Sequence, residues 1–439
     1  MLGSHVWRSR PTVSVLRCRN LWTPGTGYRP RQDDPHRRPV LALREGAEAR
    51  LRRGHPWVSP RDIKDPEALK AQSPCLVNVQ ASDGEMLGVA LYNAQGTIAA
   101  RMLSTSAFQR IDADFFADRL RKCLSYRERL FADPYYRLVH AEADGLPGLI
   151  IDRYGDQLVV QPNAAGLDTL LWPIADALEE VLKPKVVIIR QDTPGRRKEK
   201  ASAKREVLKG QYNGPTELRE NGVTFAVDLL HGQKTGWYFD HRNNRALLAT
   251  MAPQTPRVLD LYSYCGGFGV TLAQYGADHV VCVDSSEPAL ELCRRAAAMN
   301  SVGGRVKQVK ADALEFLKAE FEQRDSKSHT GEQEKEYDLV IVDPPNLGVD
   351  KLTAPKAIRH YEKLILGAAR LCASPGLLFV ASCTYNVGEK DLMGAASRAL
   401  GWLGRDYRLI STGSQAADHP GHLGLPESQY LRALLIHLF

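Results

Sequence analysis

Two residues in the last third of the chain could perform covalent chemistry on a flat heterocycle. Cys383 follows the apolar run 377–382, and Asp343 follows the apolar run 337–342. A thiolate that adds to C6 of a pyrimidine makes C5 enamine-like, so that C5 can attack a methyl sulfonium, and a carboxylate near N3 could polarise the ring. This pair therefore permits carbon methylation, although a lone cysteine at a strand end is more often a small buried hydrophobe.

Asp343 also begins a rigid turn, Asp343-Pro344-Pro345, in which the prolines lack backbone donors. Such a turn can hold an acid and carbonyl groups against the edge of a base, and it serves a purely structural role equally well. Enzymes that methylate exocyclic amines usually have an aromatic residue after the prolines, whereas this chain has Asn346. The turn thus counts against amine methylation but leaves it open.

A glycine turn lies upstream of both residues, within the stretch 258–284. One apolar run ends near Gly266, Gly267 and Gly269, a helical segment follows, and a second apolar run ends in Asp284. This order is the start of a βαβ unit, in which glycines let the backbone approach a ligand closely. The acid after the second strand is placed to accept hydrogen bonds from ribose hydroxyls. We therefore predict a nucleoside cofactor.

Two features favour S-adenosylmethionine over a dinucleotide as that cofactor. The dinucleotide fingerprint requires a third small residue at the helix–sheet contact, where this chain has Leu272. Asp260, before the turn, suits the ammonium group of a methionine moiety better than it suits a pyrophosphate. A glycine turn that binds no ligand is the remaining alternative.

The elements that must position these residues form an α/β fold. Strands alternate with helices from residue 257 onward and end in a hairpin, which predicts a doubly wound sheet. A ligand of such a sheet binds off the carboxyl ends of its strands. Asp284, Asp312, Asp343 and Cys383 all follow strands at that same edge, and this convergence predicts the site more strongly than any single motif.

Two smaller domains precede this sheet. Short strands and turns in 39–108 predict a β-rich domain. A strand–strand–helix–strand–strand pattern in 109–229 predicts an α+β domain, within which the polar, lysine-rich interval 194–219 reads as a mobile loop. The doubly wound domain takes 230–439.

A loop at the start of the doubly wound domain combines glycines, aromatic residues and cations. Such a loop can fold over a nucleoside, and it is equally typical of an interdomain connection. Lys234 is expected to contact a carboxylate or an RNA phosphate. Four further residues are assigned to the cofactor site: Phe239, Arg242, Ser285 and Ala313.

A short basic segment follows the first predicted strand. Its cations can neutralise phosphates, and its tryptophan offers a stacking face. A solvated surface is the alternative for so short a run. The predicted RNA-binding residues are Arg50, Arg52, Arg53, His55 and Trp57.

The net charge of +7 does not by itself indicate nucleic-acid binding. Residues 1–38 hold eight arginines and two aspartates, so only 50 of the 58 basic and 49 of the 51 acidic residues lie beyond them. The first acid is Asp33, and the segment before it has the composition of an organellar transit peptide, for a mitochondrion (slightly favoured) or a plastid. A disordered basic tail on a cytoplasmic protein is the alternative.

Cysteine spacing and hydropathy exclude other classes. The eight cysteines include no Cys-x-x-Cys pair, which argues against a zinc site and against a secreted disulfide scaffold. We expect reduced thiols and no metal. No apolar run approaches the ~20 residues of a membrane span, so no membrane partner is expected.

The motifs together resemble a known family, the class I 23S ribosomal RNA methyltransferases of the cytosine-C5 (RlmI-like) group. The resemblance covers 40–439 and rests on five motifs in order. They are Gly232-Gln233-Lys234-Thr235-Gly236 with Phe239-Asp240-x-Arg242, Tyr262-Ser263-Tyr264-x-Gly266-Gly267-Phe268, Asp343-Pro344-Pro345, Ser382-Cys383, and Asp418-His419-Pro420 with Pro426-Glu427-x-x-Tyr430-Leu431.

The resemblance implies a PUA-like RNA-binding domain, an α+β middle domain and a Rossmann-like methyltransferase domain. It implies Cys383 as the nucleophile, S-adenosylmethionine as the cofactor and large-subunit ribosomal RNA as the partner. The oligomeric state stays open between a monomer and a homodimer. By similarity, the cofactor pocket is lined by Asp260, Tyr262, Ser263, Gly266, Gly267, Asp284, Asp312 and Asp343.

Two departures keep other functions open. Two-cysteine RNA cytosine-C5 enzymes have a cysteine after the proline of the Asp343 turn, where this chain has Asn346, so product release would depend on another base or on water. Guanine-N7 relatives share the scaffold. The alternatives are therefore methylation of a base nitrogen (guanine N7 or an exocyclic amine), a non-catalytic RNA-binding ribosome-assembly factor and, less favoured, small-molecule methylation.

Overall fold

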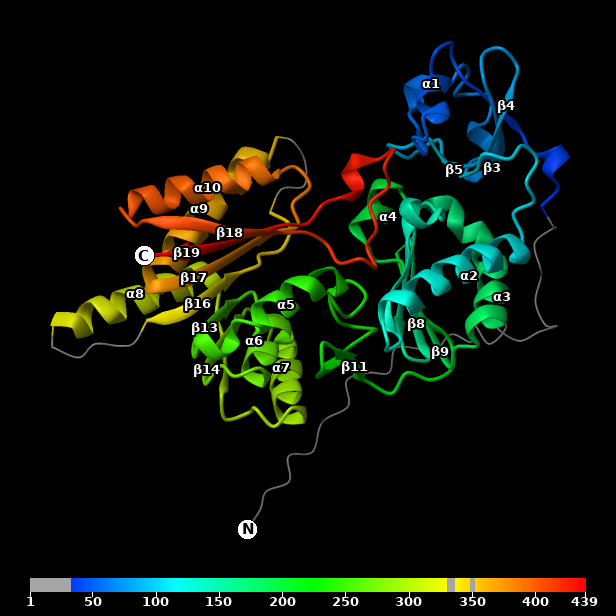
Figure 1. Ribbon diagram of the computed structural model, residues 1–439. Helices are drawn as coiled ribbons and strands as arrows, with labels where there is room; N and C mark the ends of the chain where they lie inside the picture. The colour runs from blue at the N-terminus through cyan, green and yellow to red at the C-terminus, as the bar shows by residue number, and fades with distance from the viewer. Residues whose placement is uncertain (1–32, 202, 330–335, 348–351) are drawn as a thin grey trace.

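A seven-stranded sheet builds the C-terminal half of the molecule (Figure 1). The computed structural model describes residues 33–201, 203–329, 336–347 and 352–439. The sheet order is β15-β14-β13-β16-β17-β19-β18, with β19 antiparallel to both of its neighbours. Its strands are β13 (Arg257–Leu261), β14 (His279–Asp284), β15 (Val306–Lys310), β16 (Tyr337–Val342), β17 (Cys372–Ser382), β18 (Tyr407–Gly413) and β19 (Arg432–Leu438).

Helices cover both faces of this sheet, which confirms the predicted α/β fold. Neighbouring positions of β13 show the two layers, because Val258 belongs to the core on the α6–α7 face and Leu259 to the core on the α8–α10 face. Strands buried on both faces read as continuous apolar runs in the sequence. The helices are α5 (Arg242–Ala249), α6 (Gly267–Gln274), α7 (Glu287–Met299), α8 (Ala313–His329), α9 (Ala354–Leu371) and α10 (Glu389–Trp402).

A five-stranded sheet in the order β10-β9-β8-β7-β6 forms the middle of the chain. The pattern predicted for this region has two strands before its helix α3, whereas the structure has three, because the chain turns at Gly155, whose φ is +66°, between β7 and β8. The elements here are α2 (Ala113–Leu130), β6 (Tyr135–His140), β7 (Leu149–Tyr154), β8 (Gln157–Pro162), α3 (Leu171–Leu182), β9 (Val186–Arg190), α4 (Pro194–Lys198) and β10 (Arg205–Lys209).

The predicted mobile loop 194–219 is also wrong, since it contains α4 and the edge strand β10. Arg196 explains why polar composition misled here. Its guanidinium is fully buried, with Nη1 3.0 Å and Nη2 2.8 Å from the two carboxylate oxygens of Asp168. A bidentate pair of this kind can fix a polar segment without an apolar core.

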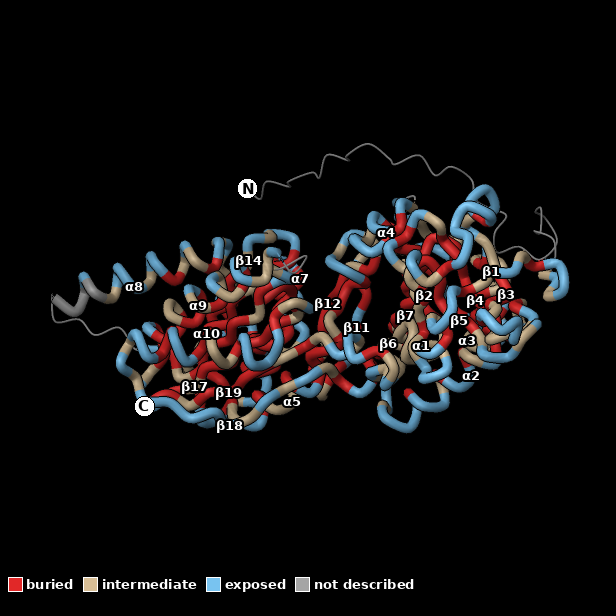
Figure 2. The backbone as a smooth tube through the Cα atoms, turned by 90° about the horizontal axis from the view of Figure 1, so that it is seen from above, coloured by how far each residue is buried: buried red, intermediate tan, exposed pale blue. Residues whose placement is uncertain are grey.

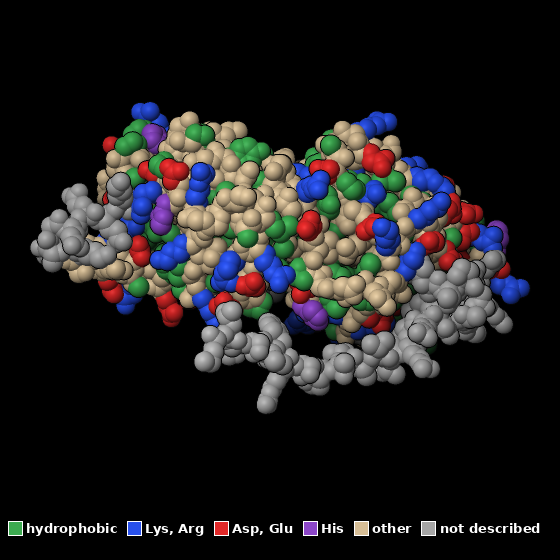
Figure 3. Space-filling model, turned by 90° about the horizontal axis from the view of Figure 1, so that it is seen from below, with side chains coloured by type: hydrophobic (Ala, Val, Ile, Leu, Met, Phe, Trp, Pro, Cys, Tyr) green, Lys and Arg blue, Asp and Glu red, His purple; other side chains and the backbone are tan. Residues whose placement is uncertain are grey.

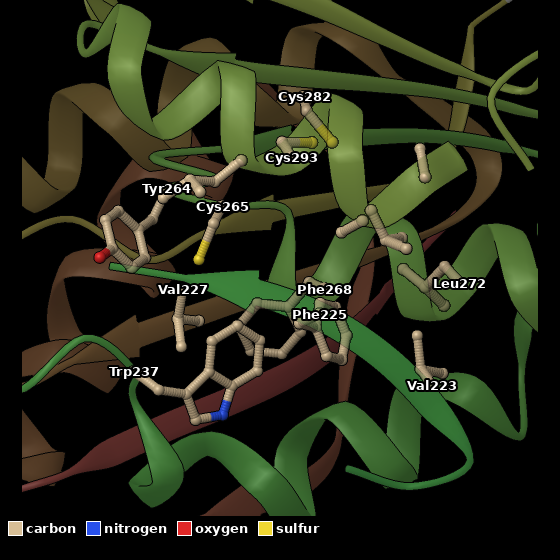
Figure 4. Close-up of a cluster of buried hydrophobic side chains, with 14 of the residues drawn as sticks. Val223, Phe225, Val227, Trp237, Tyr264, Cys265, Phe268, Leu272, Cys282 and Cys293 are labelled. Carbon is tan, nitrogen blue, oxygen red and sulfur yellow. The ribbon is translucent and has the colours of Figure 1, made fainter. Parts of the chain in front are cut away.

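The hairpin of β11 (Thr216–Glu220) and β12 (Val223–Val227) forms a separate two-stranded sheet that packs on the C-terminal half. The rings of Phe225 and Trp237 lie 4.5 Å apart in the same core as Phe268 of α6 (Figure 4). Phe225 therefore packs against the glycine-turn helix, and the domain boundary after residue 229 stays a prediction.

A five-stranded sheet in the order β1-β3-β4-β5-β2 forms the N-terminal domain, with a small core of its own. Of the predicted transit segment 1–38, residues 1–32 lie outside the described part of the chain. Among the described helices, none is both long and apolar enough to cross a membrane. The elements are β1 (Val40–Ala42), α1 (Glu48–Arg52), β2 (Trp57–Val58), β3 (Cys75–Gln80), β4 (Met86–Tyr92) and β5 (Ala100–Ser104).

One connection runs back from the C-terminal sheet to the rest of the molecule. Residues 414–431, between β18 and β19, lie beside the middle sheet in Figure 1. Asp418 is fully buried there, and its Oδ2 accepts the backbone N–H of Arg137 in β6 at 2.9 Å. Buried residues run through both halves in Figure 2. This connection therefore ties the middle sheet to the catalytic edge of the large one.

Candidate active site

A cavity of about 380 Å³ opens at the carboxyl ends of β13, β14, β16 and β17, against the loop 230–241. The two predicted catalytic residues, Cys383 and Asp343, both line it, as does Lys234 from the loop. The structure therefore brings residues that are far apart in the chain to one place. The other predicted site residues that line the cavity are Tyr262, Ser263, Gly267, Asp284, Ser285 and Asp312.

The turn between β13 and α6 has a backbone conformation that most residues avoid. Tyr262 and Tyr264 have positive φ angles of 60° and 50°, and Gly266 has one of 79°. A Cβ atom on Gly266 would come within 2.5 Å of Cys293 Sγ, so only glycine fits. Left-handed residues other than glycine concentrate at functional sites. The strain here presents the turn to the cavity.

Asp284 is held in place by this turn. Its Oδ2 accepts the N–H of Tyr264 at 2.9 Å, and its Oδ1 accepts the N–H of Ser286 at 2.8 Å. Asp312 is fixed in a similar way, because its Oδ1 accepts the N–H of Leu314 at 2.9 Å at the start of α8. A carboxylate has about four acceptor positions. Both acids can therefore also accept hydrogen bonds from ribose hydroxyls.

Asp260 lies behind the cavity wall. Its Oδ2 accepts the N–H of Gly269 at 2.9 Å, whereas its Oδ1 and the hydroxyl of Ser263 are buried without a hydrogen-bond partner. Burial raises the pKa of Asp260 to about 8. Buried polar atoms nearly always have partners, so these two oxygens fit a ligand that brings an ammonium or a carboxylate. The methionine end of S-adenosylmethionine carries both groups.

Two residues predicted to contact the cofactor, Phe239 and Arg242, do not line the cavity. Phe239 is 1% exposed, and its ring lies 5.4 Å from that of Tyr154 in the middle sheet. Arg242 donates to the carbonyl of Tyr135 and lies 4.3 Å from the ring of Phe131. Successive residues of a tight helical turn face different directions. Asp240 and His241 line the cavity, whereas Phe239 and Arg242 face the middle sheet.

Three small residues of the predicted cofactor site also stand behind the cavity wall. Gly266 and Gly269 shape the turn, and a Cβ on Gly269 would meet Cys282 Sγ at 2.4 Å. Ala313 is 3% exposed in the core of the α8–α10 face. These residues support the wall that their neighbours Gly267 and Asp312 line.

Cys383 follows the last residue of β17 and lines the cavity. Burial raises the pKa of its thiol to about 11, and the Lys234 ammonium opposes that rise. Burial disfavours the charged form of Lys234. Asp240, whose Oδ2 lies 4.0 Å from its Nζ, outweighs this together with Tyr238 and Cys383, and the pKa of Lys234 rises to about 12. The thiol is therefore protonated at neutral pH beside a permanent cation.

Asp240 and His241 are among the cavity residues that escaped the sequence reasoning. Nε2 of His241 lies 3.3 Å from Oδ2 of Asp343, and Oδ2 of Asp240 accepts the hydroxyl of Tyr430 at 2.6 Å. Both residues stand in the Phe239-Asp240-x-Arg242 motif. The motif was the available signal, but which of its side chains faces the cavity depends on the fold.

The predicted RNA-binding arginines differ in their surroundings. Nη2 of Arg52 lies 3.2 Å from Asp83 and 2.6 Å from Glu85, so its charge is already compensated. Nη1 of Arg50 lies 3.9 Å from Asp62. Arg53, which follows Arg52 in the sequence, is exposed. Figure 3 likewise shows basic and acidic side chains interspersed on one face of the molecule.

The aromatic residues of this segment contact neighbouring parts of the chain. Nε1 of Trp57 donates to Glu142 of the middle domain at 2.8 Å. His55 is half-buried, and its Nδ1 lies 3.1 Å from the backbone nitrogen of Trp57. The indole thus helps to join two domains. An RNA contact by any residue of the segment stays a prediction.

Comparison with known proteins agrees with this architecture. A PUA-like domain family matches residues 41–105, and the S-adenosylmethionine-dependent methyltransferase family matches residues 193–400. A protein from Streptococcus mutans, described as a SAM-dependent methyltransferase, superposes with a TM-score of 0.74 at 20% identity, over 91% of this chain and 100% of that one. A crystal structure of a methyltransferase complexed with SAH gives 0.75 at the same identity and coverage.

Relatives of known name are similar along nearly their whole length. Ribosomal RNA large subunit methyltransferase I of Aeromonas salmonicida is 32% identical over 401 residues, which cover 90% of this chain and 98% of the relative. The protein of the same name from Alteromonas mediterranea is 33% identical over 408 residues, with the same coverage. These likenesses show an enzyme that uses S-adenosylmethionine. The chain belongs to the ribosomal RNA large subunit methyltransferase I family.

Proposed function

We propose that this enzyme methylates C5 of a cytosine in large-subunit ribosomal RNA through a transient bond between Cys383 and C6. The observation that carries the proposal is the shared cavity, whose wall includes both the Cys383 thiol and Asp284, the acid predicted to bind the ribose. The names of the relatives support ribosomal RNA as the substrate. The resemblance to the cytosine-C5 group supports the target atom.

The reaction begins at the thiol. S-adenosylmethionine supplies an electrophilic methyl group. Cys383 gives its proton to a base or to water, its Sγ bonds to C6 of the cytosine, and the electron pair of the C5–C6 double bond moves to C5. C5 then takes the methyl group, and the sulfonium leaves as a neutral thioether. A base then removes the C5 proton, the double bond re-forms and the thiolate leaves. Asp343 lines the same cavity, and its proposed role is to polarise the ring at N3.

Lys234 makes this thiol more reactive. With its pKa at about 11, the Cys383 thiol keeps its proton at neutral pH, so it must lose that proton when the target cytosine binds. The Lys234 ammonium lowers this pKa, and its own pKa of about 12 keeps it charged over the working range. The residue predicted to contact RNA thereby acquires a second proposed role at the nucleophile.

The proposed cofactor contacts use side-chain oxygens that can accept or donate a further hydrogen bond. Asp284 and Asp312 accept hydrogen bonds from the ribose and the base edge, as their fixed carboxylates allow. The unpartnered oxygens of Asp260 and Ser263 take the methionine end. Gly267 lines the cavity between them and lets the backbone approach the ligand.

We further propose that residues 1–38 direct the protein to an organelle, with a mitochondrion favoured over a plastid. Eight arginines and no acid before Asp33 support this proposal. Fusing these residues to a fluorescent protein tests it. Organellar fluorescence is expected, and a diffuse cytoplasmic signal would contradict it. A homodimer is a separate proposal. Light scattering of the purified protein tests it.

A covalent trap tests the proposed mechanism. Large-subunit RNA transcribed with 5-fluorocytidine carries fluorine where the C5 proton must leave, so the enzyme remains bonded to C6. We expect an adduct that survives denaturing electrophoresis, requires S-adenosylmethionine and maps to the Cys383 peptide by mass spectrometry. Methyl transfer to RNA without any adduct would favour a base nitrogen, and absence of S-adenosylmethionine binding would favour an assembly factor.

A further inference from the structure

Asp240 carries an oxygen that neither the fold nor the proposed reaction uses. The residue lines the same cavity as Cys383, is 3% exposed, and stands in the tight turn Phe239–His241. Its Oδ2 accepts the hydroxyl of Tyr430 at 2.6 Å. Its Oδ1 is buried and has no hydrogen-bond partner. Asp240 therefore brings a buried carboxylate oxygen without a hydrogen-bond partner to the cavity that Cys383 also lines.

The surroundings fix this carboxylate in one orientation. Tyr430 holds Oδ2 from one side, and the backbone carbonyl of Asp240 accepts the N–H of Ala416 at 2.9 Å from the other. Both partners belong to the connection 414–431, which is anchored on the middle sheet through Asp418. Leaving a buried charged acceptor unpaired costs about 1–3 kcal/mol or more. A ligand donor at Oδ1 would remove that cost.

The charges around Asp240 indicate what kind of donor it takes. Burial alone would raise its pKa, but Lys234, His419, His241 and the Tyr430 hydroxyl together hold the pKa of Asp240 well below its usual range, so the group is an ionised, acceptor-only carboxylate. The Lys234 ammonium, 4.0 Å from Oδ2, already compensates that charge and disfavours a second cation beside it. A neutral N–H donor fits the site better than the ammonium of the cofactor.

We propose that Oδ1 of Asp240 accepts a hydrogen bond from the exocyclic amine of the target cytosine and thereby excludes uracil. This assignment rests on the proposed C5 methylation. Cytosine presents an N–H₂ donor at its C4 edge, whereas uracil presents a carbonyl oxygen at the same place. Two acceptors facing each other would repel and would leave the carboxylate unpaired. Sites built on a buried hydrogen bond to the substrate discriminate by as much as about 10⁴-fold.

The experiment compares covalent trapping on two RNAs. Large-subunit transcripts carry 5-fluorocytidine or 5-fluorouridine, and the readout is the ratio of the two adduct-formation rates with S-adenosylmethionine present. Wild type is expected to trap almost only on 5-fluorocytidine. In Asp240→Asn the amide can donate to a carbonyl, so the ratio should fall by roughly 100-fold, in keeping with a hydrogen-bonded readout of about 1–3 kcal/mol per contact.

Two further variants make the ratio specific to Asp240. Asp312→Asn makes the same chemical change at the cofactor end of the cavity, and it should slow both adducts without changing their ratio. Tyr430→Phe removes only the hydroxyl that orients Asp240, and it should move the ratio part of the way. It also tests the assignment if Asp240→Asn does not fold.

The outcomes separate this assignment from the function on which it rests. A wild-type ratio in Asp240→Asn, or in Tyr430→Phe when the first variant does not fold, overturns the role of Asp240 and leaves the carbon-methylation mechanism standing. Absence of an adduct between wild type and either RNA overturns both. A lowered ratio in Asp240→Asn with an unchanged ratio in Asp312→Asn supports the assignment.

Discussion

Nε2 of His241 lies 3.3 Å from Oδ2 of Asp343, and Nδ1 of the same ring lies 3.1 Å from the amide nitrogen of Asn244. An amide nitrogen donates, so Nδ1 accepts and the ring proton sits on Nε2, where it points at Asp343. The histidine is 3% exposed and packs edge-on against Phe268. The carboxylate at the end of β16 is thus oriented by a residue of the loop that covers the cavity.

Replacing His241 by leucine should therefore slow catalysis more than it weakens cofactor binding. Hydrogen bonds to charged groups contribute about 1.5–3 kcal/mol, which corresponds to a 10- to 100-fold loss in kcat. Affinity for S-adenosylmethionine should stay within about threefold, because Asp284 and Asp312, the proposed ribose partners, keep the hydrogen bonds that hold them. Asn244→Asp replaces the donating amide beside Nδ1 by an acceptor-only carboxylate, so it tests the tautomer without changing His241 itself. An unchanged kcat in His241→Leu would refute the orienting role.

Alkylation of Cys383 should become faster with pH up to about 11. The pKa of this thiol is raised by burial, so the thiolate is scarce at neutral pH and its fraction grows tenfold per pH unit below the pKa. Iodoacetamide labelling, followed on the Cys383 peptide by mass spectrometry, measures the profile. A midpoint near pH 8 would show that burial does not raise the pKa of the Cys383 thiol.

Lys234→Met should slow the same labelling reaction. Removing the ammonium removes the group that lowers the pKa of Cys383, and one pKa unit, about 1.4 kcal/mol, would make labelling at pH 8 roughly tenfold slower. Lys185→Met is the control, because this lysine pairs with Asp156 on the surface and its side chain is 81% exposed. Equal labelling rates in the two variants would remove Lys234 from the nucleophile's surroundings.

Asp260→Asn should weaken S-adenosylmethionine binding and flatten its pH dependence. Burial raises the pKa of Asp260 to about 8, so the ionised form that suits an ammonium gains population as pH rises towards 8. Calorimetry at pH 6.5 and pH 8.5 should show tighter binding to the wild type at the higher pH. Loss of one charged hydrogen bond predicts roughly 10- to 100-fold weaker binding in the variant at pH 8.5. Identical pH profiles would contradict the assignment.

The same variant should change the stability of the ligand-free protein. A carboxyl whose folded pKa lies above its ordinary value of 3.8 keeps its proton in the folded state while the unfolded chain loses it, so stability falls as pH rises from about 4 to 8. Asp260→Asn removes this loss. Its melting temperature should exceed that of the wild type more at pH 8 than at pH 5, and an equal difference at both values would refute the raised pKa.

Arg53→Ala should weaken RNA binding more than Arg52→Ala does. Arg53 is exposed, whereas Arg52 is paired with Asp83 and Glu85. Each lysine or arginine that contacts a phosphate contributes about one to the slope of log affinity against log salt concentration. Titrations over a salt series should therefore show the smaller slope in Arg53→Ala only. Equal slopes in both variants would remove this segment from the RNA surface.

The fold could be predicted because its signals are local. Apolar runs buried on both faces, a turn in which only glycine fits at Gly266, and acids placed directly after strands are all visible within a few residues. The edge of the sheet then follows from parallel strands alone, which is why Asp284, Asp343 and Cys383 were found. The predicted loop 194–219 failed because Arg196 is held by Asp168, a pairing that composition does not reveal.

The missing part of the site depends on contacts across the chain. The carboxylate of Asp240 accepts a hydrogen bond from Tyr430, which lies 190 residues away in sequence. His241 contacts Asp343, which follows β16. The motif around them named the right loop, but Phe239 and Arg242 turn towards the middle sheet. Side-chain direction in a tight turn is set by packing against Tyr154 and Phe131, which no local pattern encodes.

The most direct test of the central claim is to identify the methylated nucleoside. Large-subunit RNA is incubated with S-adenosylmethionine and either wild type or Cys383→Ala, digested to nucleosides and analysed by mass spectrometry. The account predicts 5-methylcytidine with the wild type and a loss of at least about 10³-fold with Cys383→Ala, since the nucleophile is removed. A nitrogen-methylated base, or undiminished 5-methylcytidine with Cys383→Ala, would contradict it.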